Sequence, residues 1–139
     1  MRTQILNLSL ILLFTVFIGC SNDDDNPIEN EILNGTWQLK NVSGGLAGVN
    51  VDYGAGEVTW TFKPSDNVLV VTNLIDSTGP EDIYAGLDTG TYNYKVQEIG
   101  QTKLLFIEEN KWGAIILSNK NLKIDEGVPA DGLLRAFTR

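Results

Sequence analysis

Apolar and polar residues alternate along most of the chain from Leu33 onward, with turn residues between the runs. In one such run Val58, Trp60 and Phe62 are separated by single threonines. A period of two residues is typical of a β-strand with one dry face and one wet face. No apolar stretch keeps helical spacing for longer than a turn or two. The pattern therefore predicts an all-β domain over residues 33–139.

The alternating runs and the continuously apolar runs together predict eight strands. They cover residues 35–42, 57–63, 67–74, 90–98, 102–107, 111–118, 121–125 and 133–139. Eight short antiparallel strands suit an up-and-down barrel, because closure of the sheet removes its exposed edges. The interior of such a barrel is filled by side chains or holds one small ligand. A β-sandwich is the alternative that the same pattern leaves open.

The connections between these strands differ in length. Successive connections of an up-and-down barrel fall alternately at its two ends. The longer ones, 43–56, 75–89 and 126–132, therefore meet at one end together with 108–110. Long loops at one rim of a rigid scaffold commonly carry binding. We expect this end to be an open mouth and the opposite end to be closed.

The first predicted strand carries a more specific signal. Gly35 and Trp37 form a Gly-x-Trp pattern that resembles the signature of lipocalins and related calycin barrels, and the glycine-rich segment 43–56 resembles the loop that lids the open end in that family. The resemblance implies a lipocalin-like, eight-stranded antiparallel up-and-down barrel. In lipocalins an arginine from the closing end packs over this tryptophan, which implies that Arg139, or in second place Arg135, lies beside Trp37.

The N-terminus has the layout of a secretory signal peptide over residues 1–19. Arg2 precedes a mostly apolar stretch, 5–18, that is too short and too interrupted to be a good membrane span. Gly19 and the chain's single cysteine, Cys20, then resemble a bacterial lipobox, in which the cysteine is lipid-modified. The resemblance implies that Cys20 anchors the protein to a membrane. A plain signal peptide with an incidental cysteine is the alternative.

Residues 20–32 are interpreted as a lipid-anchored acidic tether. Asp23, Asp24 and Asp25 lie among polar neighbours that are too poor in apolar groups to fold. Acidic residues at this place resemble the surface-export signal of one phylum of Gram-negative bacteria. We therefore expect a protein anchored to the outer membrane of a Gram-negative bacterium and facing the cell exterior if that signal is used. A merely solvating linker is the alternative.

Composition narrows the chemistry that the domain can carry out. The chain of 139 residues has no histidine and one cysteine, which excludes histidine-dependent triads, most zinc sites and an internal disulfide. Its formal charge of -8 argues against binding a nucleic acid. Asp88 begins an Asp-Thr-Gly triplet like that of aspartic proteases, but these residue types are also typical of a turn. We expect no cofactor, no metal and no enzymatic activity.

Aromatic side chains gather near the predicted mouth. Strand direction places Trp60, Tyr92, Tyr94, Phe106 and Trp112 on its upper wall, and Tyr53 and Tyr84 on the loops above. Aromatic walls with a few polar groups are typical of small-molecule pockets. The sequence therefore predicts a carrier or sensor of a small apolar or amphipathic ligand. The alternative is a barrel filled by these rings that binds a protein or glycan through loops 43–56 and 75–89.

Overall fold

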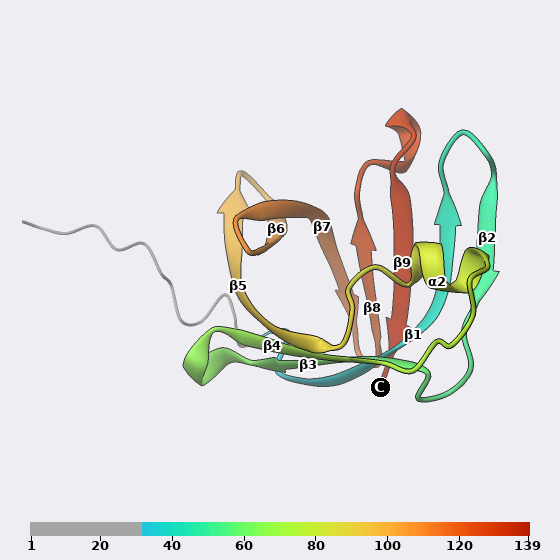
Figure 1. Cartoon of the computed structure of the whole chain (residues 1–139). Coiled ribbons are helices and arrows are strands. Elements are labelled where there is room, and N and C mark those ends of the chain that lie inside the picture. Colours follow the sequence, from blue (N-terminus) through green and yellow to red (C-terminus); the bar gives the residue numbers. More distant parts are fainter. Residues whose placement is uncertain (1–31) are drawn as a thin grey trace, which may run out of the picture.

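The strands of this chain pair with antiparallel neighbours around a closed sheet (Figure 1). A computed structural model describes residues 32–139. The predicted signal peptide, Cys20 and the tether up to residue 31 lie outside the described residues. The strands are β1 (Gly35–Gly44), β2 (Val49–Asp52), β3 (Val58–Lys63), β4 (Val68–Asn73), β5 (Gly90–Ile99), β6 (Thr102–Ile107), β7 (Asn110–Ser118), β8 (Asn121–Asp125) and β9 (Leu133–Thr138). Three short helical segments join them: η1 (Pro64–Asp66), α2 (Pro80–Ala85) and η2 (Val128–Ala130).

Closure of the barrel comes from the pairing of β1 with β9. The strand order is β2-β1-β3-β4-β5-β6-β7-β8-β9, and the additional β1–β9 pairing joins the first strand to the last. Eight strands, all but β2, therefore form an antiparallel up-and-down barrel, and the predicted all-β, lipocalin-like fold is confirmed. The sandwich alternative is excluded because each strand of this ring pairs with both of its neighbours, so the sheet has no break that would divide it into two.

The first connection differs from the prediction of a lid loop over 43–56. Strand β1 continues to Gly44, and β2 pairs back onto it from Asn41↔Asp52 to Gly44↔Val49. Gly45 and Gly48 in the turn between them have φ of 69° and 63°, a region that glycine enters without strain. Since β9 occupies the other edge of β1, strand β2 extends the same edge as β3. The segment lengthens the barrel wall instead of lying across the opening.

Trp37 ties the two ends of the described chain together. Its indole Nε1 donates to the Leu33 carbonyl at 2.8 Å. The guanidinium carbon of Arg139 lies 4.3 Å from the centre of the Trp37 ring, and Arg139 Nη1 donates to the Asn34 carbonyl at 2.8 Å. The structure thus places Arg139 and not Arg135 over the tryptophan, which is the position that the lipocalin resemblance implies.

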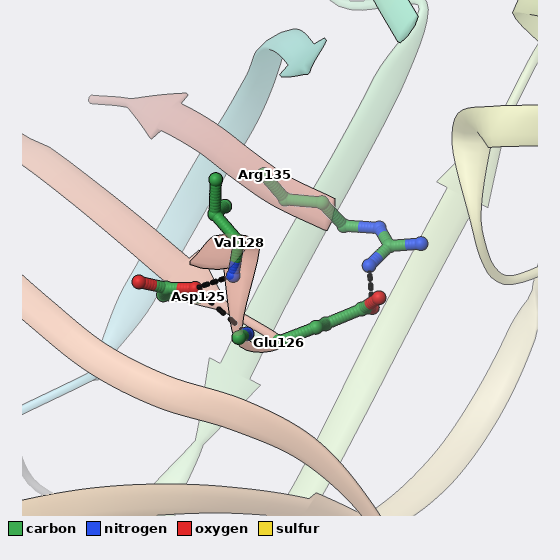
Figure 2. A network of polar contacts seen from close by, with 5 residues as sticks. Asp125, Glu126, Val128 and Arg135 are labelled. Atoms are coloured by element: carbon green, nitrogen blue, oxygen red, sulfur yellow. Dashed lines mark hydrogen bonds and ion pairs between the residues drawn. The ribbon is translucent and has the colours of Figure 1, made fainter. Parts of the chain in front are cut away.

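The turn from β8 to β9 is organised by one carboxylate. Asp125 accepts hydrogen bonds from the backbone N–H groups of Gly127 and Val128 at 2.8 and 2.9 Å (Figure 2). Gly127 itself has a φ of 108°. The two backbone hydrogen bonds favour the ionised carboxylate and lower the pKa of Asp125 below its ordinary value. The turn is therefore held in part by a charge.

Removal of the arginine over Trp37 should weaken the barrel. We expect Arg139→Ala to lower the free energy of unfolding by about 1 kcal/mol, through loss of the cation–π contact and the bond to Asn34. Arg139→Lys should lose less, and Lys123→Ala, an exposed position on β8, should change little. Urea unfolding followed by far-ultraviolet circular dichroism measures the difference. Equal stabilities for Arg139→Ala and wild type would contradict this role.

The charge of Asp125 should make part of the stability depend on pH. Asp125→Asn keeps a side-chain oxygen that can accept both backbone hydrogen bonds but carries no charge. Because the folded pKa is lowered, the wild type should be more stable than the variant at neutral pH and should lose this advantage as the pH falls below the ordinary pKa of an aspartate, about 4. Urea midpoints for both proteins across this range test the prediction. A difference that is independent of pH would show that the charge is immaterial.

Candidate functional site

Aromatic rings meet inside the barrel near the predicted mouth. Trp60 on β3 lies 5.3 Å from Trp112 on β7 and 5.0 Å from Phe137 on β9 between ring centroids. Phe62 lies 6.2 Å from Trp60 and 4.9 Å from Tyr94, which continues the cluster onto β5. Trp60 has no exposed surface. The structure therefore brings together three of the predicted wall residues, Trp60, Tyr94 and Trp112.

Helix α2 covers this cluster. It packs against β1 and β2 (Figure 1), and Ala85 at its end is fully buried. The hydroxyl of Tyr53, just after β2, donates to the Glu81 carbonyl in α2 at 3.0 Å. Just beyond the helix, a Cβ placed on Gly86 would lie 3.4 Å from the Trp112 ring. The end that the sequence predicts to be open is thus covered in this structure, and the predicted loop residue Tyr53 helps to hold the cover.

The loop that carries α2 is fastened on its far side by the Asp-Thr-Gly triplet. The hydroxyl of Thr89 accepts from the Asn73 backbone N–H at 2.9 Å and donates to the Asn73 carbonyl at 3.0 Å. The hydroxyl of Tyr92 donates to the Asp88 carbonyl at 3.0 Å. Tyr92 and Tyr84 are half-buried and pack against the core from this loop and the strand that follows it. The hydrogen bonds of the triplet therefore fasten the C-terminal end of the loop that carries α2.

Phe106 does not lie where the sequence predicts. In β6 the inward positions belong to Leu105 and Ile107, which are buried. Phe106 pairs with Lys95 of β5 and shares its outward face, and the Lys95 ammonium lies 5.7 Å from the Phe106 ring centre. Lys95 also forms an exposed ion pair with Glu109 at 3.0 Å. The prediction that Phe106 lines the upper wall of the mouth is wrong.

Arg135 is the functional candidate that the ligand prediction missed. It occupies an inward position of β9 between Leu133 and Phe137, and it is only 6% exposed. Its guanidinium carbon lies 4.9 Å from the Trp112 ring centre, and its Nη1 pairs with the Glu126 carboxylate (Figure 2). An arginine at an inward position of an alternating strand is the signal that could have identified it.

Two buried N–H groups in this cluster have no acceptor among residues 32–139. They are Nε of Arg135 and Nε1 of Trp60. Burial lowers the pKa of Arg135 to about 10, and nearby Tyr53 acts in the opposite direction. Burial likewise raises the pKa of Tyr53 to about 12, an effect that the Arg135 charge reduces. At neutral pH the covered mouth therefore contains a cationic Arg135, with unused donor capacity, next to a neutral tyrosine.

Two of the hollows on the surface of the described residues could bind a partner or ligand. A groove of about 540 Å³ lies at the end opposite α2, where Ile32, Ile115, Ile116 and Leu117 supply most of its apolar lining. A hollow of about 400 Å³ lies beside α2 and is lined by Glu57, Leu74, Ile75, Asp76, Ser77 and Glu81. The two hollows differ in chemistry, because the first is mainly apolar and the second contains three carboxylates.

Residues 32–139 contain no group of three or more His, Cys, Asp or Glu side chains placed to hold a metal ion. In the same residues, no helix has the length and hydropathy that crossing a bilayer requires.

Comparison with known proteins adds one similar fold. No family model and no curated protein matches the chain. Among solved structures, a crystal structure of a lipocalin-like protein from Bacteroides uniformis ATCC 8492 aligns with a TM-score of 0.48 and 15% sequence identity, over 78% of this chain and 98% of that one. The lipocalin-like assignment of the present barrel follows from its own strand order, from closure of β1 on β9 and from the Trp37–Arg139 contact.

Proposed function

We propose that this protein binds a small apolar or amphipathic molecule in the barrel mouth beneath α2, and that Cys20 anchors it to the outer membrane of a Gram-negative bacterium. The observation that carries the binding proposal is the pair of buried donors, Arg135 Nε and Trp60 Nε1, without an acceptor among the described residues. A buried donor without a partner costs about 1–3 kcal/mol. A bound molecule with an acceptor atom would recover that cost.

The surroundings of the two donors suit such a ligand. The Trp112 ring centre lies 4.9 Å from the Arg135 guanidinium carbon. The Trp60 ring lies 5.3 Å from Trp112 and 5.0 Å from Phe137 between centroids, so these rings continue the apolar surface beside the guanidinium. Pockets for small molecules combine apolar walls with a few convergent polar groups.

Entry of a ligand requires α2 to move. The helix has six residues, no side-chain hydrogen bond at its N-cap, and glycines at both ends, Gly79 and Gly86. The hydroxyl of Tyr53 is its hydrogen-bonded link to the barrel at Glu81. A short helix held by few contacts belongs to the part of a fold that opens most readily.

Binding can be tested with dodecanol and dodecanoic acid as probes, using calorimetry on residues 20–139. We expect Trp112→Ala to weaken binding of the better probe by about tenfold or more, because it removes one ring of the wall. Phe106→Ala is the matched control, since Phe106 lies on the outer face and its loss should leave affinity unchanged. Failure of both probes to bind the wild type, at any concentration below their own aggregation, would contradict the proposal.

The rate of probe association separates the role of α2, which covers the mouth, from the role of the aromatic rings that line it. Tyr53→Phe removes the hydroxyl bonded to Glu81 and should speed probe association several-fold. Tyr84→Phe on α2 itself removes a hydroxyl that makes no hydrogen bond to residues 32–139, and it should leave the rate unchanged. Equal association rates for Tyr53→Phe and wild type would mean that α2 does not gate the mouth.

A surface-interaction module is the second candidate function, and the hollow beside α2 favours it. Glu57, Asp76 and Glu81 meet there next to Leu74, which is 67% exposed. A barrel filled by its own rings would leave this acidic and apolar surface as the contact for a cationic protein partner or an amine-bearing glycan.

This alternative predicts loss of a cell-surface partner when the hollow changes. Glu57→Gln, Asp76→Asn and Glu81→Gln combined should abolish recovery of the partner in a cross-linked pull-down. Glu98→Gln, at the far end of the barrel, should leave it intact. Unaltered recovery with the triple variant would exclude the hollow as the contact.

A further inference from the structure

The end of the barrel opposite α2 is here called the base. It comprises the start of β1, the β3–β4, β5–β6 and β7–β8 connections, and the end of β9. At the base, β6 and β7 part from one another. Their paired register runs from Ile107↔Asn110 to Leu104↔Ala114 and stops there, although β7 continues to Ser118. The groove of about 540 Å³ lies where the two strands separate.

The groove is bordered by exposed apolar side chains. Ile99 at the end of β5 is 56% exposed and pairs with Thr102, which lines the groove. Ile116 and Leu117 on β7 are 51% and 37% exposed. Ile116 and Leu117 also line the groove, together with Ile32 and Ile115. Contiguous exposed apolar surface next to a hollow is typical of an interaction site. The base therefore offers an apolar contact surface and a space that an apolar chain can enter.

Charge is distributed unequally between the two ends. Lys63, Lys103, Lys120 and Arg139 lie at the base with the carboxylates of Asp66 and Glu98, and Lys103 forms an ion pair with Glu98 at 3.8 Å. The connections at the mouth end, 45–48, 53–57, 74–89, 108–109 and 126–132, contain no lysine or arginine and hold most of the carboxylates of residues 32–139. Positive charge near an apolar surface is attracted to anionic lipid headgroups, whereas the mouth end is repelled by them.

The path of the chain points to the same end. Ile32, the first described residue, lines the groove. Cys20 precedes it by few enough residues that the intervening segment, even fully extended, reaches at most about 40 Å. A chain anchored through Cys20, as proposed above, therefore enters the fold at the base, so the base is the end to which the anchored segment is attached.

We propose that the base of the barrel rests on a lipid bilayer and that an acyl chain of a membrane lipid occupies the groove between β6 and β7. Ile99, Ile116 and Leu117 enter the interfacial region, and Lys103 and Lys120 lie at the level of the headgroups. The mouth, with α2, then faces away from the membrane. This contact concerns a different surface from the mouth and does not depend on ligand binding there.

The orientation can be measured by hydrogen exchange on residues 20–139, since the whole described fold lies within this segment. The thiol of Cys20 is coupled to a maleimide-bearing phospholipid in vesicles of phosphatidylethanolamine and phosphatidylglycerol. We expect backbone amides 100–103 and 115–119 to exchange roughly fivefold or more slowly on vesicles than in the uncoupled chain. The amides of residues 45–48, 127, 128, 130 and 131 at the mouth should exchange at the same rate in both.

Two matched variants test which end of the barrel contacts the vesicle. Ile116→Asp changes an exposed side chain of the groove and should abolish the slowing at the base. Leu46→Asp changes a side chain that is 88% exposed at the mouth end, and it should leave the slowing intact. Coupling through Cys20 makes the test independent of whether the cell acylates this residue.

Three results would overturn the proposal. The first is unchanged exchange at the base on vesicles, and the second is equal slowing at base and mouth, which would indicate nonspecific adsorption. The third is slowing at the base in the uncoupled chain at high concentration together with a dimer in native mass spectrometry, both removed by Ile116→Asp. That result would assign the groove to a second copy of the chain. None of the three bears on probe binding at the mouth.

Discussion

The pairing of β1 with β9 is the constraint on which the rest of this structure depends. It turns a row of antiparallel strands into a barrel with an inside, and it joins residues that are almost the whole domain apart in sequence. Trp37 lies inside the barrel and Arg139 lies just after β9. The contact between them, and the hydrogen bond from Arg139 to Asn34, reinforce the same closure. Because the strand ends are fixed in this way, the rings of β3, β7 and β9 must meet at one end, and Arg135 must point among them.

Closure also determines what α2 does. Alternation along each strand decides which side chains point into the barrel, and the strands themselves form its wall. Only a connection between two strands can therefore cross the mouth and cover it. Here the β4–β5 connection supplies it, fastened by Thr89 on one side and by Tyr53 on the other. Among residues 32–139, Arg135 beneath it pairs with one carboxylate, that of Glu126, and its Nε has no acceptor. The described residues therefore satisfy only part of the hydrogen-bonding capacity of this cation.

Much of the fold could be predicted from the sequence, because period-two alternation fixes both strand position and strand phase. The bounds of β6 and β8 match the prediction, and Trp60 and Trp112 meet as strand direction requires. Phe106 could not be placed, because Leu104 to Ile107 are apolar on both faces and carry no phase. The four residues of β2 and the six of α2 are too short to give a periodic signal, so their pairing and packing depend on contacts with β1 that sequence alone does not show.

The buried pair formed by Arg135 and Tyr53 has a consequence for alkaline solution. The lowered pKa of Arg135, about 10, means that the unfolded chain holds this proton at higher pH than the folded one, so raising the pH above about 10 favours the barrel. The raised pKa of Tyr53, about 12, acts in the opposite sense over nearly the same interval, since the folded protein keeps a proton that the unfolded chain releases. The two proton linkages therefore have opposite signs. An alkaline unfolding profile of this protein reports on neither Arg135 nor Tyr53 alone, because each group masks part of the effect of the other.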